Sequence, residues 1–99
     1  MPPLEDKTVL DDQALASQLK SIEGWEKQGK AIVRRYLLPN FSEITRFMKH
    51  LAATIEDTNH HPDAILDTTT RSVTITVTTH SEGAVTQADV DFAKALNAF

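Results

Sequence analysis

The sequence contains no cysteine and only three glycines in 99 residues. Without cysteine the chain has no disulfide, no thiol nucleophile and no thiolate metal site, and this composition fits a reducing compartment. No glycine-rich loop of the kind that cradles phosphate groups is present either. Any chemistry of the chain must therefore use side chains other than cysteine.

Positive charge and long apolar runs are also scarce. The formal net charge is −4 and the pI is about 5.4, which argues against a general attraction to nucleic acid or to anionic membrane surfaces. No stretch approaches the ~20 apolar residues of a membrane span, and the N-terminus lacks the basic start and apolar run of a signal peptide. We therefore expect a cytoplasmic protein with neither nucleic acid nor membrane as a partner.

The hydrophobic pattern predicts three helices. Asp11 or Asp12 caps the first, and Gly24 lies where a C-terminal glycine would end it. The second runs from Phe41 to about Asn59, where apolar residues recur at spacings of three and four. The third begins at Thr86–Asp89, which has the spacing of a capping box. The apolar stripe of the second helix consists of Ile44, Phe47, Met48, Leu51 and Ile55.

Four strands are predicted between these helices, at residues 25–28, 31–38, 63–67 and 72–79. In the last of them Val73, Ile75 and Val77 alternate with threonines, so one face is apolar and the other polar. The order helix, strand, strand, helix, strand, strand, helix predicts a single antiparallel α+β domain over residues 1–99, with residues 1–8 loosely ordered. Helices would cover the apolar face, and the open polar face would host a site.

Three of the four histidines gather at two places in the sequence. His60 and His61 follow the predicted second helix, and His80 follows the threonine-rich strand, on its polar side. Imidazole titrates near neutral pH, so such a cluster is typical of general acid/base catalysis. Glu56 lies four residues before His60, and on a continuous helix the two would share a face, which predicts that Glu56 orients the His60 ring.

These motifs together resemble the pterin-4a-carbinolamine dehydratase family, also called 4a-hydroxytetrahydrobiopterin dehydratases. The resemblance extends over nearly the whole chain. It comprises Gly24-Trp-Glu, Phe41 through Phe47-Met48, Glu56-x-x-x-His60-His61-Pro62, Thr78-Thr-His80 and Gly83-x-x-Thr86-x-x-Asp89. It implies a four-stranded antiparallel sheet with three helices on one face, and assembly as a homodimer or homotetramer.

The resemblance also implies an activity, namely loss of water from a 4a-hydroxytetrahydropterin to give a quinonoid dihydropterin. This reaction recycles tetrahydrobiopterin after an aromatic amino acid hydroxylase has used it, and it needs no cofactor and no metal. The catalytic residues carried over are His60, His61, His80, Glu56 and Asp89. The substrate-binding residues carried over are Asn59, His60, His61, Pro62, Thr78, Thr79, His80 and Ser81. Which histidine acts as acid and which as base stays open.

The chain departs from the family pattern after His-His-Pro, where an aromatic residue is usual and Ala64-Ile65-Leu66 stands here. Other hypotheses therefore stay open: a three-histidine metal site, a non-catalytic assembly or dimerisation cofactor of the same fold, and a dehydratase for another pterin such as a molybdopterin-related compound. Asp89 also has a purely structural interpretation as the acid of a capping box. His50, on the second helix, is expected to be solvated.

Overall fold

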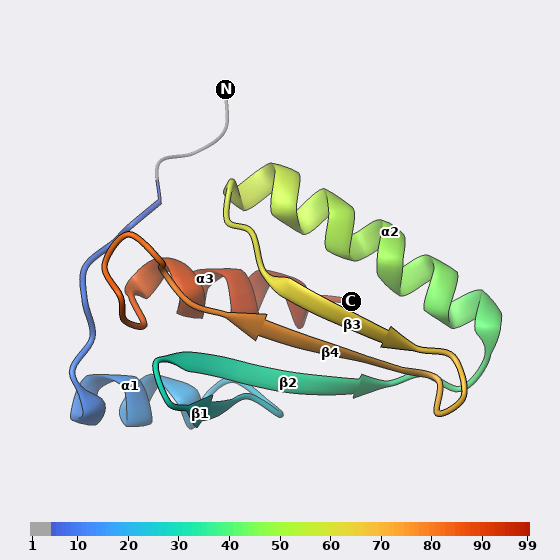
Figure 1. Ribbon diagram of the computed structural model, residues 1–99, viewed down its shortest axis with the longest axis horizontal. Helices are drawn as coiled ribbons and strands as arrows, with labels where there is room; N and C mark the ends of the chain where they lie inside the picture. The colour runs from blue at the N-terminus through green and yellow to red at the C-terminus, as the bar shows by residue number, and fades with distance from the viewer. Residues whose placement is uncertain (1–4) are drawn as a thin grey trace.

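Four antiparallel strands form one sheet in the computed structural model, which describes residues 5–99 (Figure 1). The strands are β1 Glu26–Gln28, β2 Ala31–Leu37, β3 Asp63–Asp67 and β4 Ser72–Val77. Their order across the sheet is β1-β2-β4-β3, so β1 and β3 form the edges. The helices are α1 Asp12–Leu19, α2 Phe41–Thr58 and α3 Gln87–Leu96. This element order confirms the predicted α+β fold.

One face of the sheet carries the core. Val73, Ile75 and Val77 of β4 are fully buried, whereas Thr74 and Thr76 between them are partly exposed, as the alternation predicts. The three helices pack on the buried face. They contribute to one hydrophobic cluster, with Leu15 from α1, Ile44, Phe47 and Leu51 from α2, and Val90, Phe92, Ala93 and Leu96 from α3.

Helix α2 positions the histidine pair through the way it ends. Its N-cap, Asn40, accepts a hydrogen bond from the Glu43 N–H at 2.9 Å. At the other end Asn59 has a left-handed φ of 57° while its N–H still donates to the Ile55 carbonyl. Asparagine tolerates this conformation better than most residues, and it turns the chain off the helix axis. His60 therefore lies beyond the helix rather than on one of its faces.

The N-terminal residues were expected to be loosely ordered up to residue 8, but two of residues 5–8 make backbone hydrogen bonds to α3. The Asp6 and Thr8 carbonyls accept hydrogen bonds from the first two N–H groups of α3, at 2.7 and 3.0 Å. Those N–H groups have no partner within their own helix, so an outside acceptor is favourable. The rest of the prediction falls on residues 1–4, which lie outside the described residues.

The far end of α3 is tied to the sheet by Asn97. Its Oδ1 accepts hydrogen bonds from Trp25 Nε1 at 2.9 Å, Arg34 Nη1 at 2.8 Å and the Tyr36 hydroxyl at 2.6 Å. Burial raises the pKa of Tyr36 to about 12. His50, expected to be solvated, is instead partly buried and contacts the Leu96 carbonyl through Nε2 at 2.9 Å. These contacts hold α3 in place, and with it the residues at its opposite end.

Candidate active site

The three predicted histidines lie around one pocket of about 200 Å³. Two chain segments form most of its wall. One follows α2 and the other follows β4. The pocket is lined by Asn59, His60, His61, Thr78, Thr79, His80 and Ser81, together with Glu5 and Lys7 from the N-terminal segment. Seven of the eight residues predicted to bind substrate are therefore in the lining, and Pro62 is the exception.

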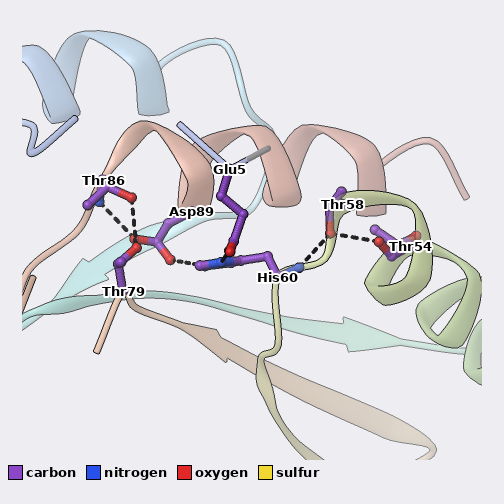
Figure 2. Close-up of polar contacts among 7 residues, drawn as sticks. All are labelled: Glu5, Thr54, Thr58, His60, Thr79, Thr86 and Asp89. Atoms are coloured by element: carbon purple, nitrogen blue, oxygen red, sulfur yellow. Dashed lines mark hydrogen bonds and ion pairs between the residues drawn. The ribbon is translucent and has the colours of Figure 1, made fainter. Parts of the chain in front are cut away.

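His60 is buried between two carboxylates, one on each ring nitrogen (Figure 2). Its Nε2 contacts Oδ1 of Asp89 at 2.5 Å, and its Nδ1 contacts Oε1 of Glu5. Its backbone N–H donates to the Thr58 hydroxyl at 3.2 Å. With both ring nitrogens and the backbone held, the orientation of His60 is fixed from three sides.

Asp89 combines two functions that the sequence presented as alternatives. The capping box at the start of α3 is present, and Oδ2 accepts from the Thr86 N–H at 2.8 Å. The same oxygen accepts from the Thr79 hydroxyl at 2.9 Å, while Oδ1 faces His60. The side chain of Asp89 is fully buried, and such a carboxylate is tolerated only when it is paired and hydrogen-bonded. Asp89 therefore caps the helix and holds His60 at once.

The surroundings of His60 favour its charged form. The hydrogen bond to Asp89 is the largest cause that raises the pKa of His60, and the Glu5 carboxylate acts in the same direction. Burial lowers the pKa but does not overcome these partners. Two carboxylate acceptors favour a ring that donates from both nitrogens, which is the imidazolium. The ring and its two carboxylates thus form one hydrogen-bonded group of opposite charges in the pocket wall.

His61 and His80 differ from His60 because both are exposed. Pro62 disfavours helical geometry at His61. His80 begins a short turn in which its carbonyl accepts from the Gly83 N–H at 3.2 Å. The two rings line the same pocket from opposite segments of the chain. Exposed imidazoles of this kind are suited to exchange protons with a bound molecule.

Glu56 does not orient His60, so this prediction is wrong. Both ring nitrogens of His60 face other carboxylates, and Glu56 is an exposed residue of α2 that is absent from the pocket lining. The four-residue spacing brings side chains together only along a continuous helix. The left-handed turn at Asn59 interrupts the helix between them.

The pocket lies at one end of the sheet and not on its open face. Thr74 and Thr76 of that face are not among the lining residues, because β4 ends at Val77 before the site begins. The stretch Ala64-Ile65-Leu66, where an aromatic residue was expected, lies on the edge strand β3 and is also outside the lining. The departure from the family pattern therefore lies away from the wall of this pocket.

Glu5 and Lys7 were not predicted from the sequence. They approach the pocket only because the N-terminal segment runs beside the loop that leads into α3 (Figure 1). No local pattern links an acidic residue at position 5 with a histidine at position 60. Among the other hypotheses, the geometry bears on the three-histidine metal site. Within residues 5–99, no group of three or more histidine, aspartate or glutamate side chains is arranged to hold a metal ion. In the same part of the chain no helix has both the length and the apolar character of a membrane span.

The family model described as Pterin 4 alpha carbinolamine dehydratase matches residues 8–99. A Thermomicrobium roseum protein with the provisional name pterin-4-alpha-carbinolamine dehydratase is 40% identical over 87 residues, which cover 88% of this chain and 91% of that protein.

Two solved structures share the fold. One is the crystal structure of a transcriptional coactivator/pterin dehydratase from Brucella melitensis, with a TM-score of 0.84 and 31% identity over 92% of this chain and 97% of that one. The other is a pterin dehydratase-like protein identified as a RuBisCO assembly factor in the alpha-carboxysome, with a TM-score of 0.60 and 24% identity over 75% of this chain and 83% of that one. The second likeness concerns the fold alone. The matched family model and the relatives that this chain covers over nearly their whole length establish that the chain belongs to the pterin-4-alpha-carbinolamine dehydratase family.

Proposed function

We propose that this protein removes water from 4a-hydroxytetrahydrobiopterin, a pterin-4a-carbinolamine, by histidine general acid/base catalysis. The observation that carries the proposal is the placement of three histidines around one pocket, one locked by carboxylates and two exposed. The family supports the reaction class. The volume of about 200 Å³ suits a single flat bicyclic ring.

The reaction breaks the C4a–O bond and forms a C4a=N5 double bond. The hydroxyl group takes a proton from an acid and leaves as water, and a base takes the proton from N5. The product is a quinonoid dihydropterin, with no change in oxidation state overall. One acid and one base near neutral pH are sufficient, and each contributes about 10²–10⁴-fold to the rate.

In this proposal His61 and His80 exchange the protons, because their rings are exposed to a bound molecule. His60 cannot readily do so while both of its nitrogens face carboxylates. It serves instead as a fixed polar part of the pocket wall, held in one orientation by Asp89 and Glu5. Asp89 acts through His60, and Glu56 has no role in this mechanism.

The test is the dehydration rate of a 4a-hydroxytetrahydropterin that an aromatic amino acid hydroxylase generates in place. The wild-type protein should accelerate the reaction, and His61→Ala and His80→Ala should each lower turnover by about 10²–10⁴-fold. His50→Gln is the matched control. His50 lies outside the pocket and a glutamine amide can still donate to the Leu96 carbonyl, so turnover should stay unchanged. Near-normal turnover in both alanine variants would contradict the mechanism.

The same assay separates the alternatives. A folded protein that does not accelerate the reaction would favour another pterin substrate, such as a molybdopterin-related compound, or a non-catalytic assembly role. The name of the Brucella melitensis protein, which joins coactivator and dehydratase, makes the second alternative relevant. Recycling of the cofactor of an aromatic amino acid hydroxylase remains the physiological context that we propose.

We also propose that the protein forms a homodimer or homotetramer. The edge strand β3 has all five residues exposed, and Ile65 and Leu66 are 68% and 45% exposed. An unprotected edge with apolar side chains is suited to pair with another chain. Sedimentation equilibrium should show an oligomer that Ile65→Lys weakens, and a wild-type monomer at all concentrations would contradict the proposal.

A further inference from the structure

The N-terminal segment is fastened to the start of α3, the helix that carries Asp89. Two of its carbonyls, those of Asp6 and Thr8, accept hydrogen bonds from the helix, and the Leu10 N–H donates to the Val85 carbonyl at 3.1 Å. A short bridge between Val9 and Thr86 continues the pairing. The position of this segment is therefore defined by the backbone of α3 and not by side-chain contacts alone.

This anchoring brings Glu5 to Nδ1 of His60, the ring nitrogen that Asp89 does not contact. Asp89 contacts Nε2 and Glu5 contacts Nδ1, so the ring lies between the two carboxylates (Figure 2). The side chains are nearly closed to solvent, with 6% of His60, 17% of Glu5 and none of Asp89 exposed. A charge so little exposed interacts strongly with its partners, because water screens it poorly.

We propose that Glu5 is a positioning residue of this site, which keeps His60 doubly protonated and correctly oriented for the proton exchange at His61 and His80. The inference rests on the proposed function for its catalytic part. It goes beyond it by assigning a role to Glu5, which belongs to no motif of the site and precedes residues 8–99, the part of the chain that the family model matches. Docking of the N-terminal segment onto α3 would then complete the active site.

Glu5 favours the doubly protonated His60 ring because it adds a second carboxylate acceptor. With Asp89 alone, Nδ1 would have no carboxylate partner and could lose its proton as the pH rises. With Glu5 in place, loss of that proton would leave a buried carboxylate without a donor, which costs free energy. Besides Glu5 and Asp89, the lining of the pocket that contains His60 includes the titratable groups of Lys7, His61 and His80.

A positive His60 also influences its neighbours. The charges of the His60 ring and of its two carboxylates together set the electrostatic potential in the pocket, where charge develops on a leaving oxygen. Removal of the Glu5 charge should therefore change the pH dependence of the reaction and not just the amount of folded protein. A merely structural contact would not have this effect.

The test compares wild type with Glu5→Gln, which keeps the size of the side chain and a carbonyl acceptor but removes the charge. Glu26→Gln, on the exposed edge strand β1, is the matched control for the loss of one negative charge. Histidine side chains labelled with ¹⁵N are titrated by NMR, and kcat and KM are measured across pH in the coupled hydroxylase assay. Trp25 fluorescence verifies that each variant is folded.

We expect the pKa of His60 to fall toward its ordinary value of 6.5 in Glu5→Gln, because one of the carboxylates that raise it is gone. We expect kcat to fall by roughly 10- to 100-fold, the scale of a lost positioning contact, with its pH profile displaced in the same direction. Glu26→Gln should match wild type in both measurements.

An unchanged His60 titration would overturn the inference, as would a pH profile of kcat that does not move, or equal changes in the control. If the wild-type protein does not accelerate dehydration at all, the proposed function fails and the catalytic part of the inference fails with it. The titration of His60 would still decide whether Glu5 sets the charge of the ring, so the two failures are distinguishable.

Discussion

Replacement of Asp89 by asparagine tests whether this buried carboxylate holds the site and the helix together. The side chain accepts from the Thr86 N–H and the Thr79 hydroxyl on Oδ2, and faces the His60 ring through Oδ1. An asparagine amide has the same shape but only one acceptor oxygen. Because hydrogen-bond donors surround both carboxylate oxygens, the N–H₂ group of the amide must point at one or more of these donors and cannot accept from them.

The expected change in the free energy of unfolding follows from the hydrogen bonds and the ion pair that Asp89→Asn removes. A hydrogen bond to a charged group contributes about 1.5–3 kcal/mol, and an N-cap contributes about 1 kcal/mol. Removal of one partner of a buried ion pair costs about 3–5 kcal/mol, since the other charge stays buried. We therefore expect Asp89→Asn to lower the free energy of unfolding by about 3–5 kcal/mol. That loss is a large part of the 5–15 kcal/mol that is typical of a small domain.

Urea denaturation followed by tryptophan fluorescence measures this change. Trp25 is the single tryptophan of the chain and is 4% exposed, so its emission reports the loss of the core. Asp91→Asn is the control on the same helix, because Asp91 is exposed and its replacement should alter stability by no more than about 0.5 kcal/mol. A loss below about 1 kcal/mol for Asp89→Asn would refute the description of Asp89 as a paired buried charge.

Three further predictions concern charge and backbone strain. Because the folded pKa of His60 is raised above 6.5, its stabilising contribution is complete below pH 6.5 and is lost as the pH rises through the folded value. The difference in the free energy of unfolding between wild type and His60→Gln should therefore be larger near pH 5.5 than near pH 9. The reverse order would contradict the charge assigned to the ring. Tyr36 is the only tyrosine, so an alkaline absorbance titration of the folded protein should give its pKa of about 12, and a midpoint near 10 would show that the hydroxyl is not buried as described. Arg71 has a φ of 54° in the turn before β4. Glycine adopts this conformation without strain, so Arg71→Gly should raise the free energy of unfolding, measured by thermal denaturation, by up to about 1 kcal/mol. A clear destabilisation would contradict that account.

The elements with strong local signals were predicted correctly. The apolar stripe of α2 placed its end within one residue, since it ends at Thr58 where about Asn59 was expected. The capping box marked the start of α3, and threonine alternation identified the buried face of β4. These features depend on neighbouring residues alone, so the sequence contains what is needed to predict them.

The site was predicted less completely, because its decisive contacts are tertiary. The sequence identified most of the pocket wall through the two histidine segments, but it assigned the orientation of His60 to Glu56, its neighbour on the chain. The structure gives that role to Glu5 and Asp89, which lie far from His60 in sequence. A spacing rule for helices could not anticipate this, since the left-handed Asn59 removes His60 from the helix.

The double use of Asp89 has a consequence for the interpretation of variants. Its oxygen Oδ2 is occupied by the Thr79 and Thr86 groups, which leaves Oδ1 aimed at His60. The rigid start of α3 thereby fixes the ring, and any substitution of Asp89 disturbs the fold and the pocket together. Glu5 is coupled to the fold less directly, since its charge pairs with His60 but takes no part in the backbone hydrogen bonds that fasten its segment. Variants at position 5 therefore remove one charge beside the His60 ring without disturbing the start of α3, which variants at position 89 cannot do.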